Sequence, residues 1–198
     1  MASAVIVARY FSNRYRLEKQ ADIDEMKLHK LLYIAQRESL VRYDKPLFPA
    51  GIYAYQYGPV VKEVREAFRH ESVPDAPSLG AVYGSEKCIV DAIFDTYSDK
   101  NSWSLSRLTH AEYSWCHARR ASNSGGSERL MSVDDIRRDA ARIRTRRALR
   151  QSLNRGSCHC RSIARSIQES FSASRHLVGS TQKCYNAKVF CGQKSLKQ

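Results

Sequence analysis

Hydrophobic residues recur at helical spacing through most of the first 150 positions of this chain. The clearest stripe has four apolar residues at i, i+3, i+4 and i+7, namely Leu28, Leu31, Leu32 and Ala35. Asp22, with Glu25 three positions later, has the pattern of a capping box at a helix start. We therefore expect a helix from Asp22 to Arg42. Burial of each such side chain contributes roughly 1.5–3 kcal/mol before entropy, so this helix should form the centre of the core.

The charged residues of the same segment fall largely on other sides of the helical wheel, namely Lys27, Lys30, Arg37 and Glu38. A basic stripe beside an apolar face usually marks the solvated side of a helix. We therefore expect these side chains to be exposed. The helix should end near Asp44, because the residue before Pro46 avoids helical geometry.

A short aromatic segment follows this helix. Residues 52–57 read IYAYQY and place a tyrosine at every second position, which is typical of a strand or an extended arm. Gly58–Pro59 predicts a turn, and proline fits the first turn of the helix that we expect next. The apolar side of that helix would consist of Val60, Val61, Val64, Ala67 and Phe68.

Weaker patterns predict the remaining elements. Further helices are expected over residues 2–13, 86–98 and 111–121, from Ser104 to near His110, and onward from Val133. Ser132 followed by Asp135 gives the last of these a start that resembles a capping box. Polar or Gly-, Pro- and Ser-rich stretches predict loops over residues 14–21, 74–84 and 122–127. Beyond about residue 153 the periodicity fades, and no regular structure is predicted there.

These patterns together predict a mainly α fold. Residues 1–150 would form a single compact helical domain with a short β-like aromatic segment, because 198 residues with 42% hydrophobic content suffice for one core. Residues 151–198 would form a basic, cysteine-containing tail that is largely disordered.

The positive charge of the chain is concentrated at its C-terminal end. Residues 1–139 carry 20 Lys and Arg against 19 Asp and Glu, whereas residues 140–198 carry 13 against Glu169 alone. The formal net charge of +13 therefore describes the tail rather than the body. Only the tail has the electrostatic footprint of a nucleic-acid binder.

The cysteines do not have the spacing of a structural zinc site. Cys158 and Cys160 are separated by one residue, and Cys184 and Cys191 by six, whereas zinc knuckles use two to four. We expect free thiols, no metal and no cofactor. The apolar runs are far shorter than the roughly 20 residues of a membrane span, and no signal peptide is evident. A cytoplasmic protein without a membrane partner is expected.

Several ordered motifs resemble one known family. Residues 27–36 read KLHKLLYIAQ and resemble the K-L-x-K-L-L-Y-x-A-Q helix of the Panacea domain, a phage-associated family. Residues 45–48, KPLF, and 52–61, IYAYQYGPVV, are similar to its K-P-L-F and I-x-A-W-x-Y-G-P-V-V segments, with Tyr55 where the family usually has Trp. Residues 105–110, LSRLTH, then Trp115 and Ala118–Arg119, are similar to a further family segment. The resemblance extends over roughly residues 5–120.

The resemblance implies a binding protein without enzymatic activity. Panacea-domain proteins neutralise unrelated toxins in toxin–antitoxin pairs, and at least one type delivers its toxin to a protease. The implied partner is a cognate toxin, with a protease as a further one. Two alternatives remain open, namely a nucleic-acid-binding regulator that uses the Arg-rich segment, and a protease adaptor or phage interaction protein without a cognate toxin. The motif residues with an implied structural role are Lys27, Leu28, Leu31, Leu32, Tyr33, Gln36, Thr109, His110 and Trp115.

The aromatic segment is the candidate partner-binding surface, with two readings. Aromatic residues are enriched at binding hot spots, which favours a toxin-facing patch formed by Tyr53, Tyr55, Tyr57, Gly58 and Pro59. Alternatively, the tyrosines pack on the preceding helix and Gly-Pro is a structural corner. We expect only part of this patch to be exposed.

Two further groups of residues have a functional and a structural interpretation. The arginines that could contact nucleic acid are Arg142, Arg144, Arg146, Arg147 and Arg150. They could equally form a solvated helix end, or belong to an extension unrelated to the family. His110, Cys116 and His117 could form a Cys–His nucleophile site. A structural role for Thr109 and His110, which would satisfy buried backbone groups, is the preferred interpretation.

Overall fold

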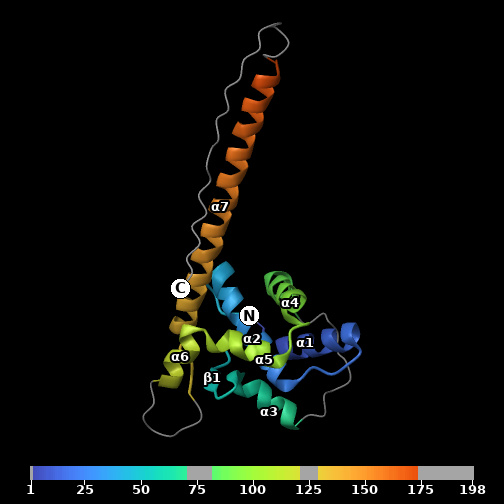
Figure 1. The fold of residues 1–198 in the computed structure, drawn as a ribbon. Coiled ribbons are helices and arrows are strands. Elements are labelled where there is room, and N and C mark those ends of the chain that lie inside the picture. The colour runs from blue at the N-terminus through green and yellow to red at the C-terminus, as the bar shows by residue number, and fades with distance from the viewer. Residues whose placement is uncertain (1, 71–81, 121–128, 174–198) are drawn as a thin grey trace, which may run out of the picture. The chain divides into compact units, whose positions relative to one another are not determined.

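The computed structural model describes residues 2–70, 82–120 and 129–173, with backbone only for His70 and residues 154–173. Within these residues the chain forms seven helices and one two-stranded sheet (Figure 1). The elements are α1 (Ala4–Lys19), α2 (Glu25–Tyr43), β1 (Ile52–Tyr55), β2 (Gly58–Val61), α3 (Lys62–His70), α4 (Gly84–Tyr97), α5 (Ser102–His110), α6 (Tyr113–Arg120) and α7 (Val133–Ala173). The predicted mainly α fold with a short β element is confirmed.

Helix α2 lies at the centre of the core. It packs against α1, α4, α5 and β2, and Figure 1 shows it surrounded by these elements. Every residue from Lys27 to Val41 is buried. The helix begins two residues later than the capping-box pattern predicted: Asp24, not Asp22, is the N-cap, and its carboxylate accepts from the Lys27 N–H at 3.1 Å. Asp22 instead pairs with Arg16.

Helix α1 is longer than predicted and includes most of residues 14–21, which we expected to form a loop. Tertiary contacts explain the difference. Arg14 forms ion pairs with Asp91 and Asp95 of α4, at 2.9 and 2.6 Å, and its guanidinium lies over the Phe94 ring at 4.3 Å. A polar sequence that looks like a loop by itself is therefore held helical by its neighbour.

Strands β1 and β2 form an antiparallel hairpin in which Ile52 pairs with Val61 and Tyr55 with Gly58. The prediction that Gly58–Pro59 leads directly into a helix is therefore wrong, and α3 begins only at Lys62. The other edge of β1 is also occupied, because the Ala54 N–H donates to the Arg129 carbonyl at 2.7 Å and a backbone bridge joins Tyr53 to Leu130.

The first part of α7 is connected to the core by polar contacts. Ser132 accepts from the Asp134 N–H at 3.2 Å, so the predicted start of this helix is correct. The buried carboxylate of Asp139 accepts from the N–H groups of Tyr113 and Ser114, both at 2.8 Å, and thereby caps the start of α6. Asp139 thus caps α6 from a helix that is more than 20 residues away in the sequence.

The chain divides into two compact units, Met1–Leu149 and Arg150–Gln198. The backbone of α7 stays helical to Ala173, which differs from the irregular tail expected after about residue 153. The rest of that tail, residues 174–198, and the loops expected near 74–81 and 122–127 lie outside the described residues. Of the helices described, none is long and apolar enough to cross a membrane.

Candidate partner-binding site

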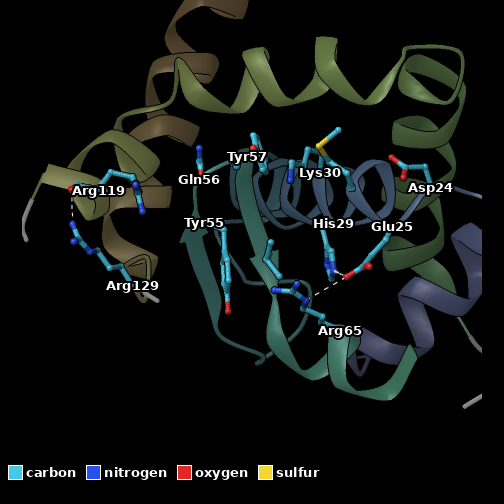
Figure 2. A pocket seen from close by; sticks show the side chains of 13 residues that line it. Asp24, Glu25, His29, Lys30, Tyr55, Gln56, Tyr57, Arg65, Arg119 and Arg129 are labelled. Atoms are coloured by element: carbon cyan, nitrogen blue, oxygen red, sulfur yellow. Dashed lines mark hydrogen bonds and ion pairs between the residues drawn. The ribbon is translucent and has the colours of Figure 1, made fainter. Parts of the chain in front are cut away.

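A pocket of about 690 Å³ opens beside the N-terminal half of α2. It lies between this helix, the β1–β2 hairpin, α3 and α6, and Figure 2 shows the side chains around it. Its lining consists of Asp24, Glu25, Met26, His29, Lys30, Tyr55, Gln56, Tyr57, Gly58, Val60, Arg65, Arg119 and Arg129. Figure 2 shows Asp24 and Glu25 at one end of the pocket and Arg119 and Arg129 at the other.

His29 and Arg65 share one carboxylate at the acidic end. His29 Nδ1 accepts from the Val61 N–H at 3.4 Å, and burial lowers the pKa of His29 to about 3. The imidazole is therefore neutral at pH 7, and Nε2 carries its proton. Both His29 Nε2 and Arg65 Nε lie 3.5 Å from Glu25 Oε1, yet neither forms a hydrogen bond within the described part of the chain.

Lys30 passes beneath the hairpin turn and is only 2% exposed. Its Nζ reaches the Pro59 carbonyl at 3.4 Å, and burial lowers the pKa of Lys30 to about 8. Gly58 makes room for this side chain: it has φ +108°, and a Cβ there would lie 2.7 Å from Lys30 Cε and 2.9 Å from Thr109 Oγ1. The glycine of the hairpin is thus required by the buried lysine as well as by the turn.

Only part of the predicted aromatic patch is accessible at the surface. Tyr53 and Tyr55 lie on the less buried face of β1, with Lys62 over the first ring and Arg65 over the second. Tyr57, in the turn, is 53% exposed. Gly58 and Pro59 are buried. This geometry favours a surface role for the tyrosines and a structural role for Gly58 and Pro59.

Tyr57 has an exposed neighbour that the sequence did not single out. Its ring meets the Trp103 ring edge to face, with centroids 5.7 Å apart, and Trp103 is 61% exposed. We call this pair the aromatic rim. Trp103 precedes the helix start predicted at Ser104, whereas the observed N-cap of α5 is Asn101. No local pattern connected Trp103 with the tyrosine segment.

The remaining motif residues hold the elements around the pocket together. Leu28, Leu31 and Leu32 lie in the core. The Tyr33 hydroxyl is 3.0 Å from Ser114 Oγ, and burial raises the Tyr33 pKa. The indole N–H of Trp115 donates to the Tyr55 carbonyl at 3.1 Å, and its ring stacks on His110 at 4.0 Å. Thr109 donates to the Ser106 carbonyl at 2.9 Å.

Gln36 links two of the sequence motifs. Its Oε1 accepts from the N–H groups of Leu47 and Phe48 at 2.8 and 3.1 Å, and its Nε2 donates to the Phe48 carbonyl at 3.0 Å. The glutamine at the end of the KLHKLLYIAQ motif therefore binds the backbone of the KPLF turn. The two motifs form one structural unit.

The four charged residues of α2 that we expected on a solvated face are buried, which contradicts that expectation. Lys27, Lys30, Arg37 and Glu38 are all at most 8% exposed. The Lys27 ammonium donates to the Ser98 carbonyl at 3.0 Å, and Arg37 pairs with Glu112. A helical wheel failed here because α2 is enclosed on all sides. The one available signal was the resemblance, whose motif contains Lys27 and Lys30 as well as the leucines.

Two of the five arginines that could contact nucleic acid serve the fold instead. Arg144 donates to the Leu40 and Val41 carbonyls at 2.8 and 3.1 Å. Arg147 forms two hydrogen bonds of 2.8 Å with the buried carboxylate of Glu38. All five are exposed, so exposure alone does not separate these two from Arg142, Arg146 and Arg150.

The proposed Cys–His combination does not form in this arrangement. The Cys116 thiol donates to the backbone carbonyl of His110 at 3.2 Å, not to an imidazole. His117 Nδ1 lies 2.8 Å from Asp135 Oδ2, and its ring stacks on Tyr113. In the described parts of the chain, no cluster of three or more His, Cys, Asp or Glu could hold a metal ion. The tail cysteines lie outside the described side chains.

Comparison with known proteins relates part of the chain to a protein family. Residues 28–116 match the model of the family described as antitoxin SocA-like, Panacea domain. This range begins at the first leucine of α2 and ends within α6, so it includes the hairpin, the aromatic rim and most of the pocket lining. No curated protein and no solved structure gives a significant match.

Proposed function

We propose, on the premise that residues 28–116 of this chain are a Panacea domain, that the protein is an antitoxin that binds and neutralises a partner toxin. The family match is the single observation that carries the proposal. Neutralisation here is binding without turnover, so the protein is not an enzyme and uses no cofactor. The encounter would take place in the cytoplasm.

The surface around the hairpin supports this proposal. Tyr57 and Trp103 are large, exposed and in contact, and aromatic residues of this kind are enriched at the centres of protein interfaces. They stand beside a pocket of about 690 Å³ with several cations in its lining. Exposed aromatic side chains next to a concave polar surface form a suitable site for a protein partner.

Growth rescue tests the proposal directly. The reading frame adjacent to this gene is expressed alone and then together with the antitoxin candidate. We expect arrest of growth in the first case and recovery in the second. The double variant Tyr57→Ala/Trp103→Ala should lose most of the rescue, whereas Tyr83→Ala, which removes a tyrosine that is 72% exposed elsewhere, should keep it. If neither neighbouring reading frame is toxic when expressed alone, the proposed antitoxin function is rejected.

Nucleic-acid binding is a second candidate, because residues 140–198 carry 13 Lys and Arg against one acid. In this case affinity for duplex DNA should fall steeply with salt, since each phosphate contact releases counterions. Replacement of the exposed Arg142, Arg146 and Arg150 should reduce that slope. An affinity that is independent of salt would exclude this candidate.

A further inference from the structure

Three residues that line the pocket carry buried hydrogen-bond donors without a close acceptor among the described residues. Lys30 is 98% buried by area, and its ammonium has three N–H donors but, within the part of the chain that the structure describes, one long hydrogen bond of 3.4 Å to the Pro59 carbonyl. His29 Nε2 and Arg65 Nε are buried without a hydrogen bond within the described residues. Buried donors of this kind destabilise a fold unless an acceptor reaches them. All three belong to residues that line the same pocket.

The charges of the lining are unequal as well. Four cations, Lys30, Arg65, Arg119 and Arg129, surround the pocket together with two carboxylates, Asp24 and Glu25. Asp24 is occupied as the N-cap of α2 and accepts from the Ser102 hydroxyl.

Glu25 lies between His29 and Arg65, as the dashed lines in Figure 2 show. Within the described ranges, no carboxylate forms an ion pair with Lys30 or with Arg119. The positive charges of Lys30 and Arg119 are therefore not balanced by a carboxylate within those ranges.

The surroundings of the pocket favour a polypeptide over a small free anion. Tyr57 lines the pocket and also contacts Trp103, which lies outside the lining. A phosphate-sized ion would use the cations and leave the aromatic rim exposed. An extended peptide could place one carboxylate among the cations and an adjacent apolar side chain on the rim.

We propose that this pocket binds a carboxylate side chain of an acidic segment of the toxin, with Lys30 and Arg119 as its cationic partners and Tyr57 and Trp103 as the platform for the neighbouring residue. The inference rests on the proposed antitoxin function, which it deepens by naming the chemistry of the partner. Charge-assisted hydrogen bonds in a partly desolvated pocket are the strong kind. The bound carboxylate would also supply the acceptor that Lys30 lacks.

A random-peptide display library, selected on the immobilised full-length protein, tests the inference without knowledge of the toxin. We expect selected peptides to be enriched in Asp or Glu next to an aromatic or aliphatic residue. Replacement of that acid by its amide should weaken binding about tenfold or more, which is the size expected from loss of a charged contact. The variants Lys30→Met and Arg119→Met should weaken binding similarly. Arg120→Met, which changes an exposed arginine outside the lining, should not.

The outcomes separate this inference from the proposed function. Peptides without acidic enrichment, no selected peptide, or equal binding by Arg119→Met and the wild type would overturn the pocket assignment even if growth rescue succeeds. Binding of inorganic phosphate at millimolar concentration, by a protein that selects no acidic peptide, would assign the pocket to a small anion instead. If acidic peptides are selected but growth rescue fails, the pocket assignment stands and the proposed antitoxin function is rejected. Circular dichroism on each variant confirms folding, and Arg119→Met, which changes a half-buried arginine, provides the test if Lys30→Met does not fold.

Discussion

At the scale of single residues, the buried ammonium of Lys30 lowers the stability of the folded protein, because burial disfavours its charged form. Its folded pKa of about 8 lies below the ordinary 10.5, so the unfolded chain binds the proton more tightly. The resulting penalty is fully present below pH 8 and disappears as the pH rises towards 10.5. From the pKa difference it is on the order of 3 kcal/mol at pH 7.

We therefore predict that Lys30→Met stabilises the free protein, by about 1–3 kcal/mol at pH 7, because a hydrophobic side chain of similar shape needs no acceptor. The gain should shrink between pH 8 and pH 10.5, measured by thermal unfolding at each pH. Lys45→Met, at an exposed position, is the matched control and should change neither stability nor its pH dependence. Destabilisation at pH 7 would show that Lys30 is already satisfied in the free protein.

Gln36 gives the opposite prediction. Its amide makes three buried hydrogen bonds to the backbone of Leu47 and Phe48. Gln36→Met keeps the shape but leaves two N–H groups and one carbonyl without their partner, so we expect a loss of about 2–4 kcal/mol in chemical denaturation. Gln36→Glu retains the acceptor for both N–H groups and should lose less than Gln36→Met. Equal losses for the two variants would show that the backbone N–H groups do not depend on this acceptor.

At the scale of elements, two arginines of α7 contact α2. Arg144 satisfies carbonyls at the end of α2, and Arg147 pairs with Glu38, which is 2% exposed and already bonded to Arg42. Removal of a partner from a buried carboxylate is expensive, although the Arg147 side chain is itself half exposed, which reduces the effect.

We expect Arg144→Met/Arg147→Met to lower the unfolding free energy by about 2 kcal/mol. Arg142→Met/Arg146→Met changes two exposed arginines of the same helix and should leave stability within about 0.5 kcal/mol. Urea titration of the two double variants makes the comparison. Equal stabilities would mean that α7 does not depend on these contacts, and the arginines would again be available to nucleic acid.

The elements also show how far the sequence alone could lead. The leucines of α2 identified the core helix, because a period of 3.6 is a local property. Burial of Lys30 and Glu38 could not be read from that period, since it depends on what surrounds the helix. Likewise, Gly58–Pro59 followed by two valines is compatible with a helix start or a strand, and only pairing with Ile52–Tyr55 decides it. The fold places three distant arginines, Arg65, Arg119 and Arg129, in the lining of one pocket. No regular spacing in the sequence predicts that they line the same pocket.

At the scale of the whole molecule, the charge and the candidate site belong to different parts of the chain. The pocket lining and the aromatic rim all lie within the unit Met1–Leu149. Most of the excess positive charge lies beyond residue 140. The binding of a toxin and any binding of nucleic acid are therefore separable by truncation.

We predict that a chain ending at Leu149 folds with an unchanged thermal midpoint for the helical unit and still rescues growth from the toxin, because it retains Arg144, Arg147 and the entire pocket. Its affinity for duplex DNA should fall and become less dependent on salt, since nine of the 13 basic residues of segment 140–198 lie in residues 150–198 and are removed. A chain ending at Ala141 is the matched control: it lacks both arginines and should unfold at lower temperature. If the chain ending at Leu149 folds but does not rescue growth, part of the toxin interface lies beyond residue 149. The pocket would then be insufficient for neutralisation.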